Sequence, residues 1–310
     1  MVSTPGTSGN ASGPLSVLVA GSSGFLGTHL TTALRERGHA VTSLVRSEPT
    51  DVHQVRWDPY AGQVPQDRVD AADVVVNLAG SPTAGNPHSE KWARELRESR
   101  VTTTRVLAQA ISASPSPAAY LAGNGISWYG DHGDQVLTEA SDTRGHGLLT
   151  DVTRVWQEAA RPAQDAGARV CFLRTSPVMD SAAPPFKQLR LVFKAGLGAR
   201  LGSGEQYMPM SSLRDWVGAV VHLAEHESAS GPFNICLPTA PTNAEFTRAL
   251  ASAVHRPALV AVPSPLIKVG AARMASELLN SYRTVPQALT DVGFEFADGD
   301  VDQLIATALA

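Results

Sequence analysis

Three glycines near the N-terminus have the spacing of a phosphate-binding turn. Gly21, Gly24 and Gly27 stand in VLVAGSSGFLGTHL, residues 17–30, where an apolar run breaks at the first glycine and an amphipathic helical pattern follows. After a strand and before a helix, backbone N–H groups and the positive end of the helix converge where a pyrophosphate can bind. The first glycine permits the tight turn, the second lets phosphate approach, and the third lets helix and strand pack closely. The pattern predicts a dinucleotide site at Gly21, Ser23, Gly24, Phe25, Leu26 and Gly27, with a purely structural glycine turn as the alternative.

The end of the second predicted strand indicates which dinucleotide would bind. An acidic residue at this place accepts a hydrogen bond from the ribose 2′-hydroxyl of NAD. Here the strand ends as SLVR, so Arg46 occupies the place instead of a carboxylate. A guanidinium can form charge-assisted, bidentate hydrogen bonds with a 2′-phosphate. We therefore expect NADP(H) as the cofactor, with a solvated loop cation as the alternative role for Arg46.

A second turn of small residues follows the third predicted strand. Asn77, Leu78, Ala79 and Gly80 close this turn, and we expect them beside the adenosine ribose of the cofactor. Asparagine also occurs simply as a turn residue, which is the alternative for Asn77.

Alternating strand and helix patterns place both turns at one edge of a sheet. From Ser16 to about Val170, short β-branched runs alternate with helical stretches, which is typical of βαβ units. The predicted strands are 16–20, 40–45, 73–79, 118–123 and 169–175, and the predicted helices are 25–37, 88–113 and 148–166. This order predicts an α/β fold with a Rossmann-type, doubly wound parallel sheet, whose ligand binds at the carboxyl ends of the strands.

The rest of the chain predicts a smaller unit above that edge. Residues 176–215 are rich in proline, glycine and cationic residues, after which 214–226 predict a helix, 231–238 a strand and 242–256 another helix. We expect a dinucleotide-binding domain over 15–178 with a return segment at 214–238, and a small, mostly helical substrate-binding cap over 179–213 and 239–310. Residues 1–14, rich in Gly, Ser, Thr and Pro, predict a disordered tail.

The composition favours a globular protein with a small-molecule ligand. Hydrophobic residues make up 43% of the 310 residues and charged residues 17%, and the formal net charge is -4. This charge gives no reason to expect nucleic acid or an anionic membrane as a partner. No segment approaches the ~18 consecutive apolar residues of a membrane helix, and the N-terminus lacks the features of a signal peptide. Cys171 and Cys236 have neither metal-ligand nor disulfide-framework spacing, so we expect buried free thiols and a cytoplasmic location.

The chain contains the motifs GSSGFLG, NLAG and WYG (128–130). Together these motifs resemble the extended short-chain dehydrogenase/reductase superfamily, the group of NAD-dependent epimerases and dehydratases. A closer resemblance is to its atypical, epimerase-like branch with a short C-terminal domain of unknown function. This likeness spans residues 16–300 and rests on segments such as WDPYAG (57–62), GLGARLGSGEQY (196–207), PTNAEF (241–246) and VPQALTDVGFEF (285–296). It implies an NADP(H)-binding domain and a small substrate domain, but no particular substrate.

The catalytic pair of that superfamily is missing from this chain. Its reductases use a Tyr and, four residues later, a Lys; the phenol exchanges a proton with the substrate and the ammonium lowers the pKa of the phenol. No Tyr-x-x-x-Lys occurs here, and alignment on Gln157 puts Leu149 and Thr153 at the two positions. The serine that should polarise the substrate oxygen is replaced by Asn124, which can still hydrogen-bond a carbonyl.

Few other side chains in the sequence are candidates to take over the roles of the missing Tyr and Lys. Tyr129, in the turn after the fourth strand, is the best candidate acid, with a packing role as the alternative, and Asn124 is the second catalytic candidate. Arg100 is more simply interpreted as part of an exposed amphipathic helix face. Gln206 and Tyr207 follow a glycine-rich loop that the resemblance places over the substrate, so we expect them to select it. The histidines lack metal-ligand spacing, so no metal site is predicted.

Two functions remain as hypotheses. The first is an NADP(H)-dependent oxidoreductase or epimerase-like enzyme that acts on a small carbonyl or hydroxyl substrate under the cap. The second is a catalytically silent NADP(H)-binding sensor or partner-binding protein. The resemblance also implies a possible homodimer through the helices at 88–113 and 148–166.

Overall fold

A seven-stranded parallel sheet forms the centre of the computed structural model, which describes residues 13–310. Its strand order is β11-β7-β5-β4-β1-β2-β3, and all its pairings are parallel. This is the Rossmann order, in which the chain winds outward in both directions from the centre of the sheet, so the predicted fold class is confirmed. The strands are Ser16–Ala20 (β1), Ala40–Val45 (β2), Gln54–Arg56 (β3), Val74–Asn77 (β4), Ala119–Gly125 (β5), Val170–Thr175 (β7) and Gly231–Ile235 (β11).

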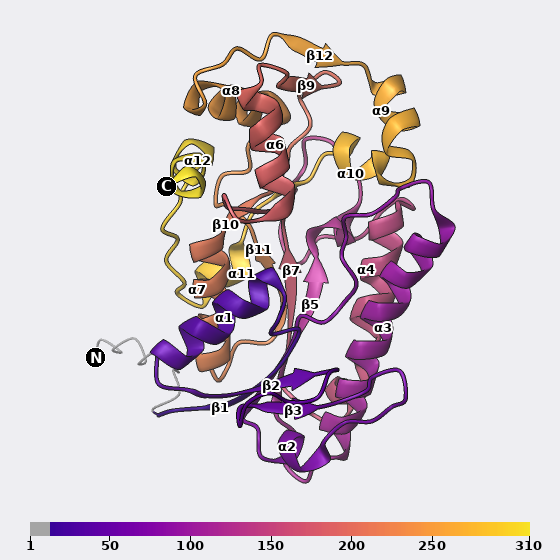
Figure 1. Cartoon of the computed structure of the whole chain (residues 1–310), viewed down its shortest axis with the longest axis vertical. Helices are drawn as coiled ribbons and strands as arrows, with labels where there is room; N and C mark the ends of the chain where they lie inside the picture. The colour runs from indigo at the N-terminus through magenta and orange to yellow at the C-terminus, as the bar shows by residue number, and fades with distance from the viewer. Residues whose placement is uncertain (1–12) are drawn as a thin grey trace, which may run out of the picture.

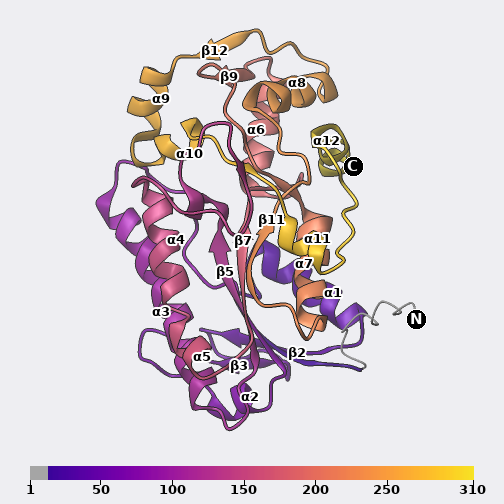
Figure 2. The ribbon, with the colours of Figure 1, turned by 180° about the vertical axis from the view of Figure 1, so that it is seen from behind.

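Helices cover both faces of this sheet (Figure 1 and Figure 2). On one face, Leu30, Leu34 and Trp216 pack against strand residues in a core that also includes Leu289. On the other face, a second core contains Leu107 of the longest helix. The strands are apolar on both sides because both faces are buried. The helices of the two layers are Phe25–Glu36 (α1), Leu213–Glu225 (α7) and Gln287–Asp291 (α11), and, opposite, Gln66–Asp70 (α2), Glu90–Ala113 (α3), Leu148–Glu158 (α4) and Arg161–Asp165 (α5).

A smaller, mostly helical part lies beyond the carboxyl ends of the central strands (Figure 1). Its own hydrophobic core joins Phe186, Phe193, Phe246 and Leu304. The helices here are Pro184–Lys194 (α6), Asn243–Ala253 (α8), Ser264–Ala271 (α9), Ala275–Leu279 (α10) and Val301–Leu309 (α12), with 3-10 turns at Ile126–Tyr129 (η1) and Ala272–Met274 (η2). Short parallel pairs join Val136–Leu137 (β6) to Arg283–Thr284 (β13), Val178–Met179 (β8) to Ser211–Ser212 (β10), and Ala199–Leu201 (β9) to Val260–Val262 (β12).

The structure differs from the sequence predictions in a few elements. The predicted helix 148–166 is divided into α4 and α5, because Pro162 in the first turn of α5 has no N–H to continue the helical hydrogen bonds. The segment 176–215 contains α6, and the edge strand β3 is additional. The predicted tail, residues 1–14, lies outside the described residues except for its last two. The proposed domain limits stay a prediction, and α11, in the segment assigned to the cap, contributes Leu289 to the core on the sheet.

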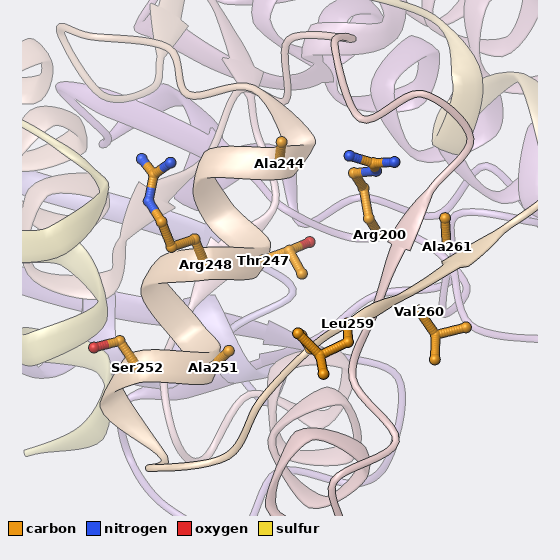
Figure 3. Close-up of a pocket in the computed structure, with 10 residues that line it drawn as sticks. Arg200, Ala244, Thr247, Arg248, Ala251, Ser252, Leu259, Val260 and Ala261 are labelled. Carbon is orange, nitrogen blue, oxygen red and sulfur yellow. The ribbon is translucent and has the colours of Figure 1, made fainter.

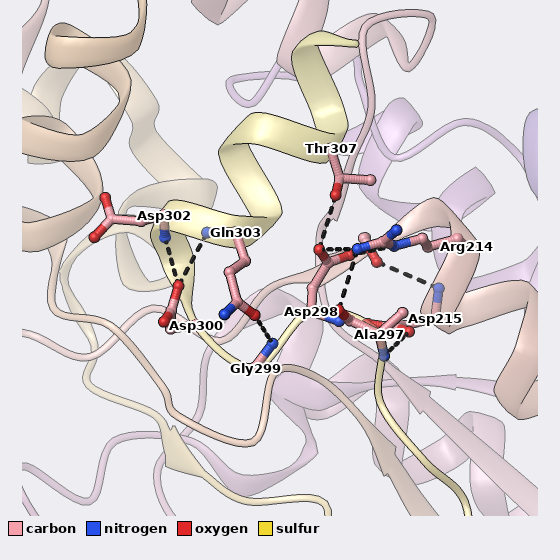
Figure 4. A network of polar contacts seen from close by, with 10 residues as sticks. Arg214, Asp215, Ala297, Asp298, Gly299, Asp300, Asp302, Gln303 and Thr307 are labelled. Carbon is pink, nitrogen blue, oxygen red and sulfur yellow. Dashed lines mark hydrogen bonds and ion pairs between the residues drawn. The ribbon is translucent and has the colours of Figure 1, made fainter.

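A polar network ties the C-terminal segment to α7 (Figure 4). Arg214 donates hydrogen bonds to both carboxylate oxygens of Asp298, at 2.5 and 2.9 Å, and Thr307 donates to the same carboxylate at 2.8 Å. Asp215 accepts hydrogen bonds from the backbone N–H groups of Ala297 and Asp298, at 2.8 and 2.9 Å. The carboxylate of Asp215 thus serves to anchor the segment that leads into α12.

Candidate functional site

The glycine turn between β1 and α1 is a tight, open cradle. Gly21 has φ +85°, and a Cβ there would lie 2.6 Å from the carbonyl carbon of Leu78; a Cβ on Gly27 would overlap the carbonyl oxygen of Gly21. The N–H of Gly24 donates to the same oxygen at 3.1 Å. No side chain caps the N-terminus of α1, and its first turn contains no acidic residue. The first backbone N–H groups of α1 are therefore free to bind an anion, which is a requirement of a pyrophosphate site.

The turn after β4 packs directly against the glycine turn. Asn77 is fully buried; its Nδ2 donates to Thr104 Oγ1 at 2.9 Å, and its Oδ1 accepts from the N–H of Ala79 at 3.0 Å. Asn77 therefore shapes the turn, and its expected place beside the cofactor stays a prediction. Since Leu78 contacts the glycine turn at Gly21, the two turns form one edge with the main-chain groups of residues 77–80 beside the cradle.

Two arginines flank this edge in different environments. Arg46 is exposed just after β2 and forms no hydrogen bond or ion pair with any residue of the described range 13–310. Arg100 of α3 is half-buried; it donates to the carbonyl oxygen of Ser81 at 3.1 Å and to Thr83 Oγ1 at 3.0 Å, and its guanidinium lies over the ring of Trp156. Burial lowers the pKa of Arg100 to about 10, so it remains a cation at neutral pH. Its interpretation as an exposed-face residue was wrong, because α3 turns it toward the loop after NLAG.

The end of β5 is closely packed against α4. A Cβ on Gly123 would lie 2.7 Å from the carbonyl oxygen of Asn77, and one on Gly125 would lie 3.1 Å from the methyl group of Thr153. Asn124 is buried; its Nδ2 donates to the carbonyl oxygen of Thr153 at 3.2 Å and its Oδ1 accepts from the N–H of Gly125 at 2.7 Å. Both polar functions of Asn124 are thus bound to backbone, which suits a residue that positions α4 against the strand end.

Tyr129 belongs to a buried polar cluster behind the strand ends. Its hydroxyl donates to Asn234 Oδ1 at 2.7 Å and accepts from Arg174 Nη1 at 2.8 Å. The guanidinium of Arg174 stacks over the ring of Trp128, 3.7 Å from its centroid. Burial raises the pKa of Tyr129 to about 12, although Arg174 opposes the shift. A fully buried phenol that is paired on both sides and holds its proton tightly is suited to a positioning role and not to proton transfer near neutral pH.

Gln206 and Tyr207 connect their loop to α10. Gln206 Nε2 donates to the carbonyl oxygens of Leu201 and Leu278, both at 3.1 Å. The backbone N–H of Tyr207 donates to Ser281 Oγ at 3.0 Å, and the guanidinium of Arg283 lies over the Tyr207 ring. These contacts fix the position of α10, and the expected role of both residues in substrate selection stays a prediction.

One pocket lies within the smaller part of the molecule, and none of the predicted site residues lines it. It has a volume of about 420 Å³ between α8 and the β9–β12 pair, and Arg200, Thr247, Arg248, Ser252 and Leu259 are among the residues that line it (Figure 3). Both arginines are exposed. The pocket is therefore an open surface feature of the smaller part and not part of the glycine-turn edge.

Several further sequence predictions concern the chain as a whole. Cys171 and Cys236 are free and buried, as expected, and burial raises the pKa of their thiols to about 11 and about 12. In the described part of the chain, His, Cys, Asp and Glu do not form any group of three or more that could hold a metal ion. Within residues 13–310, none of the helices has both the length and the apolar character needed to cross a bilayer.

Comparison with known families gives two matches along the chain. A model described as the NAD dependent epimerase/dehydratase family matches residues 17–236, and a domain of unknown function, DUF1731, matches residues 262–308. An epimerase family protein of Mycobacterium bovis is 38% identical over 293 residues, which cover 94% of this chain and 97% of that protein. The human epimerase family protein SDR39U1 is 32% identical over 286 residues, covering 91% and 95%.

Solved structures are similar over almost the entire chain. The crystal structure of human SDR39U1, isoform 2, with NADPH has a TM-score of 0.84 and 28% identity and covers 95% of this chain and 99% of that one. A nucleoside-diphosphate sugar epimerase from Corynebacterium glutamicum has a TM-score of 0.79 and 32% identity, covering 96% of this chain and 58% of the other. MoeE5 in complex with UDP-glucose and NAD has a TM-score of 0.73 at 22% identity, a likeness of fold alone.

Proposed function

Since the chain belongs to the NAD-dependent epimerase/dehydratase family, we propose that it binds NADP(H) along the glycine-turn edge and acts there on a small carbonyl or hydroxyl compound. The observation that carries the proposal is the uncapped N-terminus of α1, above a turn that only glycine fits at positions 21 and 27. The NADPH in the human relative's structure supports the choice of cofactor. The cofactor would supply hydride transfer.

The described residues fit the parts of this cofactor. The free N–H groups of α1 would hold the pyrophosphate, the main chain of residues 77–80 would line the adenosine ribose, and Arg46 would pair with the 2′-phosphate. Arg100 adds a half-buried positive charge at the same edge, beyond the NLAG turn. In this proposal, Asn124 and Tyr129 position the end of β5 and the loop after it, because their side chains are engaged with Thr153, Asn234 and Arg174.

One observation favours a catalytically silent NADP(H)-binding protein as the second candidate. Leu149 and Thr153 stand at the positions of the superfamily's Tyr and Lys, and Thr153 donates its hydroxyl to the carbonyl oxygen of Thr150 within α4. Neither side chain can exchange a proton with a substrate near neutral pH.

A titration with a substrate screen tests both candidates. Purified protein is titrated with NADPH and with NADH by fluorescence, and then mixed with NADPH and a panel of aldehydes and ketones while NADPH absorbance is followed. Tight, NADPH-selective binding supports the cofactor proposal, and carbonyl-dependent oxidation supports the enzyme. Binding without turnover of any probe favours the silent protein, whereas no binding of either dinucleotide contradicts both candidates.

A further inference from the structure

A carboxyl group from a distant part of the sequence lies near the start of α4, the helix from which the superfamily's tyrosine is missing. Glu277 of α10 accepts a hydrogen bond from Ser127 Oγ at 2.5 Å through its Oε2. Ser127 is in η1, directly after the end of β5. The neighbouring Ser276 contacts Gly147, the N-cap of α4, so α10 packs against the helix start at which Leu149 aligns with the superfamily's tyrosine. Glu277 is thus brought to the start of α4 from a distant part of the sequence.

The contacts of α10 hold this carboxyl group in a fixed position. Ser276 packs against Gly147, the N-cap of α4, so closely that a Cβ on this glycine would lie 2.9 Å from Ser276 Oγ. Gln206 binds the carbonyl oxygen of Leu278 on the other side of Glu277. Arg273, just before α10, pairs with Glu90 of α3 at 2.9 Å. These contacts fasten α10 to both the cap loop and the helices beside the sheet.

One oxygen of the carboxyl group has no hydrogen-bond partner among residues 13–310. Glu277 Oε1 is fully buried, and no donor or acceptor in the described chain reaches it with hydrogen-bond geometry. None of the ion pairs among residues 13–310 involves Glu277. A buried polar atom without a partner is costly, so Oε1 beside the start of α4 is suited to bind a ligand atom.

Burial favours the protonated form of the Glu277 carboxyl group. It raises the pKa of Glu277, while Ser127 and the first turn of α4 at Leu149 oppose the shift in part. The titratable neighbour whose own pKa responds to Glu277 is the buried Tyr282, which stays neutral near pH 7 because its pKa is also raised. A carboxyl group with a raised pKa can serve as an acid near neutral pH, which an ordinary carboxyl group does poorly.

We propose that Glu277, oriented by Ser127, is the proton-transfer residue of this site in place of the absent tyrosine and lysine. The proposal rests on the proposed function, because it needs NADP(H) at the glycine-turn edge. In the reducing direction, hydride reaches the carbonyl carbon, the O–H bond at Glu277 Oε1 breaks, and its proton forms the new hydroxyl group of the product. The carboxylate that remains keeps the Ser127 hydrogen bond and regains a proton from water; oxidation reverses these steps.

A test without a substrate uses the charge of the nicotinamide ring, which is positive in NADP⁺ and neutral in NADPH. Near Glu277, this positive charge lowers the carboxyl pKa, so binding of NADP⁺ should release protons that binding of NADPH does not. Calorimetric titrations in buffers of different ionisation enthalpy, at a series of pH values from the ordinary carboxyl pKa of about 4.3 upward, count these protons. We expect a difference approaching about one proton per site in the wild type. Protons taken up or released by the 2′-phosphate are the same for both cofactors, so they cancel in the difference.

Substitutions test whether Glu277 is the source of this difference in proton release. Glu277→Gln should abolish it, whereas Glu158→Gln, at the opposite, exposed end of α4, should retain it. Ser127→Ala removes a donor that favours the carboxylate, so the pH of half-release should rise, and Ser127→Thr should restore it. If both cofactors bind but the proton difference is absent, or persists in Glu277→Gln, the inference is wrong and the cofactor proposal stands. If neither cofactor binds, the proposed function itself fails.

Stability measurements check that Glu277→Gln is folded and give an independent readout. Because the folded pKa is raised, the contribution of Glu277 to stability is full below its ordinary pKa and is lost as the pH rises through the folded value. Glutamine has no proton to lose, so the melting temperature of Glu277→Gln relative to the wild type should increase with pH. A parallel pH dependence of both proteins would contradict the raised pKa and with it the acid role.

Discussion

Replacing Arg46 by alanine should weaken NADPH binding selectively. Arg46 is exposed at the end of β2, and within residues 13–310 it has no hydrogen-bond or ion-pair partner. The substitution therefore removes a charge without removing a hydrogen bond or ion pair among residues 13–310. We expect a change of less than about 0.5 kcal/mol in the free energy of unfolding, as for surface positions in general.

The size of the binding effect follows from the exposure of the arginine. A hydrogen bond to a charged group contributes about 1.5–3 kcal/mol, and solvent around an exposed side chain favours the lower end of this range. At about 1.4 kcal/mol per factor of ten, the dissociation constant for NADPH should rise about 10- to 30-fold. The constant for NADH, which has no 2′-phosphate, should change by less than about twofold on the same scale. The NADPH effect should shrink as salt screens the charges.

Fluorescence titrations of both cofactors at low and high salt measure these constants. Arg56→Ala is the matched control, because Arg56 is also exposed, lies on the neighbouring strand β3 and pairs with Glu48. It should leave both affinities unchanged. Equal affinity of Arg46→Ala and the wild type for NADPH would refute the 2′-phosphate role, and an equal loss for NADPH and NADH would indicate a general disturbance of the turn.

Three further substitutions test the framework of the site. Gly27→Ala should abolish binding of both dinucleotides and lower the melting temperature, because the new Cβ would overlap the carbonyl oxygen of Gly21. Gly270→Ala is the matched control: position 270 in α9 has open space around it, so this substitution should not destabilise the fold. Tyr129→Phe should cost about 1–3 kcal/mol in denaturant unfolding, since Asn234 and Arg174 lose a buried partner, while NADPH affinity stays constant. Burial raises the pKa of the Glu225 carboxyl group, but hydrogen bonds from Arg37 and His39 lower this pKa by more. The pKa in the folded protein therefore lies below the ordinary value, and the stabilisation by this carboxylate is lost as the pH falls through the folded pKa. Glu225→Gln should therefore be less stable than the wild type at pH 7 by about 1.5 kcal/mol, with the gap closing in acid; a constant gap would contradict the ion-pair explanation.

The sheet and the glycine turn could be predicted because their signals are local. Strands β1 and β2 begin and end at the predicted residues, since a buried parallel strand is a short apolar run bounded by turns. The three-residue strand β3, QVR, has no such run, and it is defined by pairing with the edge of β2. The start of α6 was obscured by prolines, which are acceptable in the first turn of a helix but read as loop residues in a sequence.

The chemical roles were harder to predict because they depend on burial and distant contacts. Tyr129 stands next to a tryptophan and a glycine in the sequence, which gives no sign that Arg174 and Asn234 enclose its hydroxyl. Arg100 has the spacing of an exposed helix residue, but the loop after β4 folds over it. Glu277 is 150 residues from Ser127, and nothing in the composition of the short α10 distinguishes it from a surface glutamate.

The absence of both tyrosine and lysine is consistent with a carboxyl group as the acid. A phenol, with an unperturbed pKa near ~10, needs a nearby cation to bring its pKa down toward neutrality. A carboxyl group, with an unperturbed pKa near ~4.3, needs the opposite shift, which burial supplies and a neighbouring ammonium would cancel. The leucine and threonine at positions 149 and 153 bring no charge to the start of α4, so the pKa of Glu277 can stay raised. On this reasoning, a lysine at position 153 would oppose the raised pKa of Glu277, so its absence fits the proposed role of the carboxyl group.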